Sequence, residues 1–293
     1  MKIDGRAIAN QILNDLAGKV TRLTQKGMVP TLAVILVGED PGSLSYIKQK
    51  QNAAAAIGAI VLVNQQPKTI TLGELEDLIT QYNQNHSIHG LIIQRPLPGT
   101  LERARTILNT ISPAKDVDGF VPNSAFVVPV AAAVGEILKN VKCQMSNYKE
   151  LQENDFLDWL RSKQIVVIGR GETVGKPLAD YLANLDCATS IVHSQTPNPT
   201  EIIKSADIIV SCVGKEQVVN KDNLKPGVIL IGVGIWRDNK GKLRGDYEEE
   251  EVTAVASFYT PTPGGVGPVN VACLMKNLVE ACTSFSNGKL NNL

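Results

Sequence analysis

The sequence predicts an α/β protein of two domains, and three observations lead to this prediction. Its 293 residues exceed what one hydrophobic core usually organises. Short apolar runs alternate with helical patterns in both halves, as they do in parallel βαβ units. A glycine-rich turn between a strand and a helix, near residue 170, then starts a second pattern of the same kind.

The N-terminal half alternates between helix and strand. Apolar residues recur at helical spacing over residues 7–23 and stop before Gly27. The continuous apolar run Thr31–Val37 predicts a strand that is buried on both faces. Ser43 is expected to cap a helix that ends before Gly58. Further elements are expected as a strand over 59–63, a helix over 72–85 and a strand over 90–94.

The C-terminal half repeats this alternation after a helix expected over residues 131–140. An amphipathic helix within 141–163 is favoured by the spacing of Tyr148, Leu151, Phe156, Trp159 and Leu160. The elements that follow are expected as strand Ile165–Ile168, helix 174–184, strand Thr189–Val192, helix 200–205, strands 208–212 and 228–231, and a last helix over 269–285. The acidic stretch 246–251 is interpreted as solvated surface.

Composition excludes several classes of function. The chain has 29 basic and 29 acidic residues, so it offers no electrostatic footprint for nucleic acid or anionic lipid. No apolar run approaches the about 20 residues of a membrane span, and the N-terminus lacks the apolar core of a signal peptide. We therefore expect a cytoplasmic protein without nucleic-acid or membrane partners.

The cysteines and histidines have no metal-ligand spacing. The five cysteines are scattered, and the three histidines have no acidic or histidine companion at ligand distance along the chain. We expect reduced, mostly buried thiols and no metal site.

A glycine-rich turn follows the strand Ile165–Ile168. Gly169, Gly171 and Gly175 suit a tight turn whose backbone approaches a pyrophosphate, with helix amides facing the negative charge. An ordinary βα turn is the alternative interpretation. The βα units around the turn favour a dinucleotide site.

The end of the next strand indicates which dinucleotide binds. NAD sites usually offer a carboxylate there, whereas residues 193–196 contain no acid. Arg170 in the glycine turn, with the hydroxyls of Ser194 and Thr196, suits a 2′-phosphate. We therefore expect NADP; the alternative is that Arg170 is simply solvated.

Tyr46 and Lys50 are one helical turn apart and share a helix face. Such a pair can pack on a substrate, and a desolvated lysine can transfer protons. A surface lysine beside a half-buried tyrosine is the alternative. Short-chain dehydrogenases show the same spacing, but there it follows the glycine turn, whereas here it precedes it.

Three further segments stand at strand ends or in turns, where α/β proteins form their sites. They are residues 94–98 (Gln-Arg-Pro-Leu-Pro), 115–120 (Lys-Asp-Val-Asp-Gly-Phe) and 263–268 (Pro-Gly-Gly-Val-Gly-Pro). Glycine lets the last of these approach a ligand through its backbone. Each alone is compatible with a turn; together they indicate a site.

These residues closely resemble one enzyme family over nearly the whole chain, the bifunctional methylenetetrahydrofolate dehydrogenase/methenyltetrahydrofolate cyclohydrolases. The resemblance is carried by Ile3-Asp4-Gly5-Arg6, Val37-Gly38 with Pro41, Ser43, Tyr46 and Lys50, Gln94-x-Pro96-Leu97-Pro98, Lys115 through Phe120, Gly169-Arg170, Val174-Gly175-x-Pro177, His193-Ser194, Gly245-Asp246, and Thr260 through Pro268.

The resemblance implies a fold and two activities. An N-terminal three-layer αβα catalytic domain (1–139), to which the last helix (269–293) returns, would precede a Rossmann-like NADP-binding domain (140–262). The enzyme would oxidise 5,10-methylenetetrahydrofolate to the 5,10-methenyl form with NADP. Hydrolysis to 10-formyltetrahydrofolate would follow in the same cleft. A homodimer is implied, as is a role in the one-carbon metabolism that supports purine biosynthesis.

The resemblance also implies roles for individual residues. Lys50 would be central to hydrolysis, Gln94 would orient Lys50, Tyr46 would pack on the folate rings and Asp118 would bind the pterin. Other residues on the folate side would be Ile93, Arg95, Pro263, Gly264 and Gly265. The NADP contacts would be Gly169, Arg170, Gly171, Val174, Gly175, Ser194, Ile235, Val266 and Gly267.

The chain departs from the family pattern at several places. Gly171 replaces a serine, Gly232 replaces an aspartate and Arg95 replaces a leucine. The segment 129–134 lacks the usual Pro-Cys-Thr-Pro-x-Gly, and the connection 141–163 is long. If Arg95 points inward, it should lower the pKa of Lys50 by like-charge repulsion.

Three alternatives stay open at this point. An NADP oxidoreductase of the shikimate-dehydrogenase layout would give Gln94 no role. A nucleotide-binding protein with a decayed site would take up NADPH without turnover. An enzyme could also retain only one of the two steps.

Overall fold

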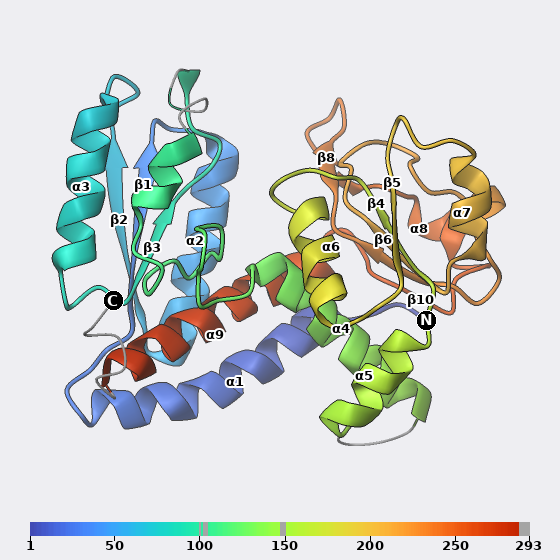
Figure 1. Ribbon diagram of the computed structural model, residues 1–293, viewed down its shortest axis with the longest axis horizontal. Helices are drawn as coiled ribbons and strands as arrows, with labels where there is room; N and C mark the ends of the chain where they lie inside the picture. The colour runs from blue at the N-terminus through green and yellow to red at the C-terminus, as the bar shows by residue number, and fades with distance from the viewer. Residues whose placement is uncertain (100, 102–104, 147–150, 287–293) are drawn as a thin grey trace. The chain divides into compact units, whose positions relative to one another are not determined.

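The computed structural model describes residues 1–99, 101, 105–146 and 151–286 (Figure 1). Its contacts divide the chain into two compact units. One comprises Asn10–Pro129 with the chain from Val271 onward, and the other comprises Met1–Ala9 with Val130–Asn270. Both units are α/β, which confirms the predicted class. The expected boundaries of 1–139 and 140–262 stay a prediction.

The first unit is built on a parallel sheet of three strands in the order β2-β1-β3. These are β1 (Thr31–Val37), β2 (Ile60–Gln66) and β3 (Gly90–Ile93). The central strand β1 is buried along its whole length, as its continuous apolar sequence predicts.

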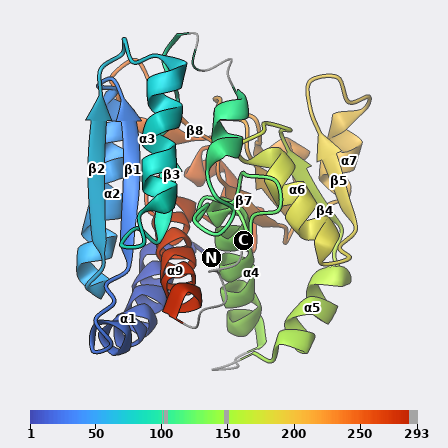
Figure 2. The same cartoon turned by 60° about the vertical axis from the view of Figure 1, so that its left-hand side comes forward.

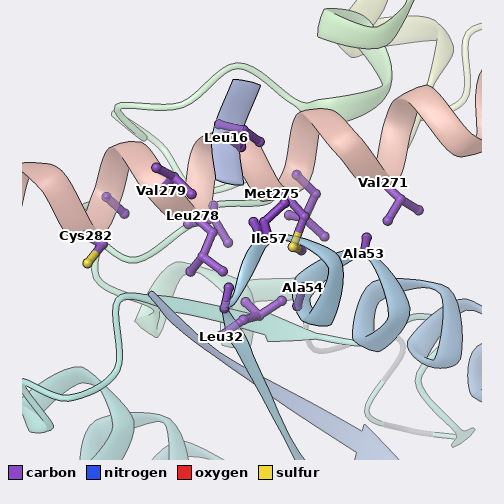
Figure 3. Close-up of a cluster of buried hydrophobic side chains, with 14 of the residues drawn as sticks. Leu16, Leu32, Ala53, Ala54, Ile57, Val271, Met275, Leu278, Val279 and Cys282 are labelled. Carbon is purple, nitrogen blue, oxygen red and sulfur yellow. The ribbon is translucent and has the colours of Figure 1, made fainter. Parts of the chain in front are cut away.

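Helices cover both faces of this sheet. The side chains of Leu32, Val34 and Leu36 pack against one set of helices, α1 (Gly5–Thr24), α2 (Pro41–Ile57) and α9 (Val266–Ser286). The alternate residues of β1 pack against α3 (Leu72–Gln84) and the 3-10 helix η2 (Arg105–Thr110). Figure 3 shows the apolar side chains of α9 from Val271 on lying over those of α2 and Leu32. The unit is therefore the expected three-layer αβα domain, and the last helix returns to it.

One detail of α2 differs from the prediction. The helix begins at Pro41 and is capped by Asp40 rather than by Ser43. The Asp40 carboxylate accepts hydrogen bonds from the Ser43 amide (2.7 Å) and the Ser43 hydroxyl (2.9 Å). A carboxylate is a strong cap because it also interacts favourably with the positive end of the helix dipole. Gly58 ends the helix in the left-handed conformation (φ 80°), as expected.

The second unit contains a parallel sheet of five strands in the order β10-β7-β6-β4-β5. The strands are β4 (Ile165–Ile168), β5 (Thr189–Val192), β6 (Ile208–Ser211), β7 (Ile229–Gly232) and β10 (Phe258–Tyr259). β5 and β6 lie on opposite sides of β4. The winding direction therefore reverses between β4 and β6, and doubly wound sheets bind ligands beyond the carboxyl ends of the strands at such a point.

Helices and one hairpin complete the second unit. They are α4 (Pro129–Ser146), α5 (Glu153–Arg161), α6 (Gly175–Asn184), α7 (Pro199–Ser205), η3 (Lys221–Asn223), α8 (Glu249–Val252), and the hairpin of β8 (Ile235–Arg237) and β9 (Leu243–Gly245). Part of the amphipathic pattern expected within 141–163 forms α5, which buries Phe156 and Leu160. Leu151 precedes this helix, residues 141–146 belong to α4, and Tyr148 lies outside the described residues. Across the described ranges, no helix is long and apolar enough to cross a membrane.

The interpretation of residues 246–251 as solvated surface is wrong for its first two residues. Asp246 is fully buried, and Tyr247 is only 6% exposed. Both side chains find hydrogen-bond partners inside the unit, which allows polar groups to be buried there. Only the acidic residues that follow them are exposed or half-buried.

Candidate active site and cofactor site

A buried lysine and a glutamine form a hydrogen-bonded pair in the first unit. Lys50 lies in α2 and is only 9% exposed, and its Nζ donates to Gln94 Oε1 at 2.9 Å. Gln94 directly follows β3, and its Nε2 donates to the Arg95 carbonyl at 2.9 Å. This second bond fixes the orientation of the amide, so that its oxygen faces the lysine. The predicted pairing of Lys50 with Gln94 is present.

Burial lowers the pKa of Lys50, because desolvation disfavours its charged form; the nearby Asp118 carboxylate opposes this shift. A lysine with a lowered pKa is more readily available as the neutral amine. Arg95 is not among the causes, because its guanidinium lies over the Phe120 ring, 4.4 Å from the centroid. The like-charge repulsion expected if Arg95 pointed inward is therefore not part of the shift.

A tight turn positions Asp118. The preceding Asp116 is 2% exposed and accepts hydrogen bonds from the amides of Gly119 (3.1 Å) and Val121 (2.8 Å). Gly119 has φ 75°, and a Cβ there would lie 2.8 Å from the Phe126 carbonyl oxygen, so the turn requires glycine. The Asp116 carboxylate thus stabilises the turn through its hydrogen bonds. The carboxylate whose charge acts on Lys50 is that of Asp118.

The remaining residues predicted on the folate side of this unit lie on α2, at the end of β3 and in the turn that contains Asp118. Tyr46 is half-buried on α2, one turn before Lys50. Ile93, Arg95 and Asp118 line a common small cavity of about 10 Å³. Ile93 also belongs to the hydrophobic core, with 3% of its surface exposed.

The predicted glycine turn lies in the second unit, between β4 and α6. Gly169 has φ 108°, and a Cβ on it would lie 3.0 Å from the Cys212 carbonyl oxygen. A Cβ on Gly175 would lie only 2.2 Å from the Gly169 carbonyl oxygen, so the helix can start here only with glycine. Gly171 has open space around it. Two of the three glycines are thus required by close approach, as a turn that holds a pyrophosphate requires.

The loops after β4 and β5 meet through a polar contact. Arg170 is exposed, and its Nη2 donates to Gln195 Oε1 at 2.9 Å. Ser194 is exposed beside it, whereas the Thr196 hydroxyl accepts a hydrogen bond from the His193 amide. Val174, the last predicted residue of the turn, is half-buried and precedes α6.

The other predicted cofactor residues lie at the start of a strand and at the start of a helix. Ile235 begins β8 and is 38% exposed. Its carbonyl oxygen would lie 2.9 Å from a Cβ on Gly214, so the two segments are in close contact. At the start of α9, Val266 is 5% exposed, and Gly267 is exposed.

The loop over residues 260–265 is packed tightly against the N-terminal segment. A Cβ on Gly5 would lie 1.9 Å from the Gly265 carbonyl oxygen. Gly264 has φ 106° and a half-buried position, while Pro263 is exposed. The glycines therefore serve both the loop conformation and its packing.

Gly232, which replaces an aspartate of the family pattern, has a structural partner. The Tyr247 hydroxyl donates to the Thr260 carbonyl (2.6 Å), and the Gly232 amide donates to the Thr260 hydroxyl (2.8 Å). A Cβ on Gly232 would lie 2.9 Å from Tyr247 Cε1. The Tyr247 ring therefore occupies the space into which a side chain at position 232 would extend.

Sequence reasoning missed Asp116 and Asp246 as residues that organise loops. The acidic stretch 246–251 includes Asp246, but the Gly245-Asp246 pair is also part of the family resemblance, and this is the signal that separates it from the residues that follow. Within the described residues, no group of three or more His, Cys, Asp or Glu could hold a metal ion. Burial, with a smaller contribution from Asp246, raises the pKa of Cys212, so this thiol stays protonated.

A buried lysine–glutamine pair in one α/β unit and a Rossmann-like glycine turn in the other characterise a two-domain enzyme that uses a dinucleotide. Comparisons with known proteins refine this class. Residues 3–118 match the tetrahydrofolate dehydrogenase/cyclohydrolase catalytic domain, and residues 143–286 match the NAD(P)-binding domain of the same proteins. This chain belongs to the tetrahydrofolate dehydrogenase/cyclohydrolase family.

Individual relatives agree over the full length. The bifunctional protein FolD of Lactococcus lactis subsp. cremoris is 40% identical over an alignment of 298 positions that covers 99% of this chain and 99% of that protein. The crystal structure of FolD from Campylobacter jejuni gives a TM-score of 0.88 at 34% identity, with 97% of this chain and 99% of that chain covered. The Trypanosoma brucei enzyme, complexed with NADP and an inhibitor, gives 0.84 at 32% identity and 97% coverage of both chains.

Proposed function

We propose that the enzyme oxidises 5,10-methylenetetrahydrofolate with NADP and then hydrolyses the methenyl product to 10-formyltetrahydrofolate. The two activities are those of the family to which the chain belongs. The observation that carries the proposal is the buried Lys50, hydrogen-bonded at 2.9 Å to an amide that is itself fixed. The alternatives of a shikimate-dehydrogenase layout and of a decayed nucleotide-binding protein give this pair no purpose.

In the hydrolytic step, we assign Lys50 the role of proton acceptor. Water adds to the methenyl cation and gives one proton to the neutral amine of Lys50, which leaves a neutral carbinol. The bond from that carbon to N5 then breaks as the carbinol hydroxyl loses its proton and N5 gains one. The formyl group stays on N10, and the overall step releases one proton. Gln94 holds Nζ in place and accepts its hydrogen bond without adding a charge, so the pKa stays low. We assign Asp118, whose charge acts on Lys50, to bind the pterin, and Tyr46 to provide the flat surface for the rings.

For the oxidative step, the glycine turn and the exposed Arg170 and Ser194 suit NADP. When bound, NADP supplies the acceptor for the hydride that leaves the methylene carbon. Gly169 and Gly175 allow the tight turn between β4 and α6, and the open space at Gly171 leaves room for a pyrophosphate to approach the backbone. Arg170, already turned toward the loop after β5 by Gln195, would neutralise the 2′-phosphate.

The test of the reaction follows two signals at once in purified protein given methylenetetrahydrofolate and NADP. NADPH should rise while the methenyl chromophore stays low, because the second step removes it. If neither NADP nor NAD gives NADPH, the assigned substrate is wrong and a binding protein becomes the better account.

The test of cofactor choice compares Arg170→Ser with the parent enzyme. The ratio of kcat/KM for NADP to that for NAD should fall at least about tenfold, since a charge-assisted bond to the 2′-phosphate is lost. Arg22→Ser, an exposed arginine of α1, should leave the ratio unchanged. An unchanged ratio in Arg170→Ser would show that Arg170 is merely solvated.

We also propose a homodimer formed through the β2 edge of the first unit. Figure 2 shows β2 at the outer edge of its sheet, where Ile60 and Leu62 are 44% and 45% exposed. An exposed apolar edge strand is usually protected by pairing.

We place the enzyme in the cytoplasm: all five cysteines lie within the described residues, and none forms a disulfide with another.

A further inference from the structure

The loop that follows β6, residues 212–215, borders the point where the sheet of the second unit reverses its winding. β6 is the neighbour of β4, and the loops that follow these two strands are in contact at Gly169 and the Cys212 carbonyl. Any ligand held by the glycine turn therefore lies against this second loop. The contacts that fix the conformation of residues 212–215 should therefore also affect cofactor binding.

The loop closes around a buried carboxylate. Asp246, fully buried, accepts at Oδ1 from the amides of Gly214 (2.7 Å) and Lys215 (3.0 Å). At Oδ2 it accepts from the Ser211 hydroxyl (2.6 Å) and the Val213 amide (2.9 Å). Three successive amides thus converge on one anion, with Gly214 in the left-handed region (φ 69°), which is the geometry of a backbone anion nest.

The Asp246 carboxylate also packs directly against a second segment, the turn that contains Gly234. Gly234 passes so close that a Cβ on it would lie 2.3 and 2.4 Å from the two Asp246 oxygens and 2.4 Å from the Gly214 amide nitrogen. The amides of Val233 and Gly234 both donate to the Ser211 carbonyl (2.8 and 3.0 Å), and Ile235 comes next. Asp246 therefore holds the loop after β6, and the turn that presents Ile235 is packed directly against it.

We propose that Asp246 is a positioning residue for the dinucleotide: its carboxylate acts as an internal anion that fixes residues 213–215 and the turn before Ile235 in the binding-competent conformation. The proposal rests on the proposed cofactor site and extends it to a residue that does not touch the cofactor. An isosteric amide cannot replace the carboxylate, because its NH2 group would face backbone N–H donors.

The experiment measures NADP binding directly by calorimetric titration, together with KM for NADP and hydrolysis of supplied methenyltetrahydrofolate, a reaction that needs no NADP. Asp246→Asn should raise the Kd and KM for NADP at least about tenfold, since hydrogen bonds to a charged acceptor are lost. Its hydrolysis rate should equal that of the parent. Gly234→Ala, which intrudes on the carboxylate from the other side, should reproduce the same defect.

The matched control is Asp238→Asn. Asp238 also accepts hydrogen bonds from loop amides, those of Lys240 (3.0 Å) and Lys242 (2.9 Å), but in the turn of the β8–β9 hairpin. The Asp238→Asn variant should leave the Kd for NADP unchanged. If Asp246→Asn does not fold, Ser211→Ala, which removes one of the four donors, should still raise the Kd severalfold.

Three outcomes are distinguishable. Parent-like NADP binding in a folded Asp246→Asn, or in Ser211→Ala where Asp246→Asn does not fold, overturns the proposal. An equal loss of binding in Asp238→Asn also overturns it, because the effect would then be general weakening of the unit. A parent enzyme that binds no NADP would instead refute the proposed cofactor itself.

Discussion

Burial lowers the pKa of two lysines that have different roles in the molecule. Lys50 is desolvated in the candidate active site, and its pKa is lowered. Lys115 is 3% exposed and donates to the carbonyls of Tyr82 (2.8 Å) and Asn85 (2.7 Å) at the end of α3. The first lysine is assigned to chemistry and the second to structure.

The first prediction concerns the charge next to Lys50. Hydrolysis of methenyltetrahydrofolate should decline as the pH falls through the pKa of Lys50, because the ammonium form cannot accept a proton. Gln94→Glu places a carboxylate at the same hydrogen-bond distance, which favours the ammonium form and raises this pKa. The acid limb of the kcat profile should therefore move to higher pH.

The control for this prediction is Gln81→Glu, which adds the same charge on the exposed side of α3. Its pH profile should match that of the parent. If Gln94→Glu also leaves the acid limb of the kcat profile in place, Lys50 does not govern the pH dependence of the hydrolytic step.

The second prediction concerns stability. Burial lowers the pKa of Lys115 from 10.5 to about 8, so between these values the unfolded chain binds more protons than the folded one. The free energy of unfolding should therefore gain a contribution that rises between about pH 8 and 10.5. Denaturant unfolding across this range should show a shallower pH slope for Lys115→Met than for the parent. Lys48→Met, at an exposed position, should keep the parent slope; equal slopes in all three would contradict the assignment.

At the scale of elements, the glycine turn after β4 separates glycines required by packing from one that is not. A Cβ on Gly175 would lie 2.2 Å from a backbone oxygen, whereas Gly171 has open space. Gly175→Ala should therefore destabilise the second unit by more than about 2 kcal/mol and abolish NADP binding. Gly171→Ala should change stability by less than about 0.5 kcal/mol. Thermal unfolding and NADP titration check both, and equal effects of the two variants would count against this account of the turn.

Elements with strong periodicity could be predicted from the sequence, while loops held by distant partners could not. β1 and β4 have the predicted bounds because continuous apolar runs leave little choice. The role of Asp246 was hidden because its donors come from residues 211–215, more than thirty positions away. The cap of α2 was placed three residues late because both Asp40 and Ser43 are good capping residues.

The candidate site shows the same division between local and distant information. The Lys50–Gln94 pair could be predicted through the family resemblance, and the structure brings the two side chains together. The direction of Arg95 could not, because the Phe120 ring that receives its guanidinium depends on the turn made by Asp116. Side-chain direction in a loop is set by tertiary partners that no local pattern records.

At the scale of the whole molecule, the assembly proposed through β2 gives a further prediction. Leu62→Glu adds charge to an exposed apolar edge position and should convert a homodimer into monomers in sedimentation experiments. Both activities should persist if each subunit holds a complete set of site residues. A parent that sediments as a monomer would refute the dimer, and a Leu62→Glu variant that stays dimeric would place the interface elsewhere.

Hydrolysis of supplied methenyltetrahydrofolate shows whether the Lys50–Gln94 pair carries the hydrolytic step of this bifunctional folate enzyme. Methenyltetrahydrofolate is supplied to the parent, to Lys50→Met and to the exposed control Lys48→Met on the same helix, and loss of its chromophore is followed. We expect parent-like hydrolysis in Lys48→Met and no enzymatic hydrolysis in Lys50→Met. Hydrolysis at the parent rate in Lys50→Met would contradict this expectation.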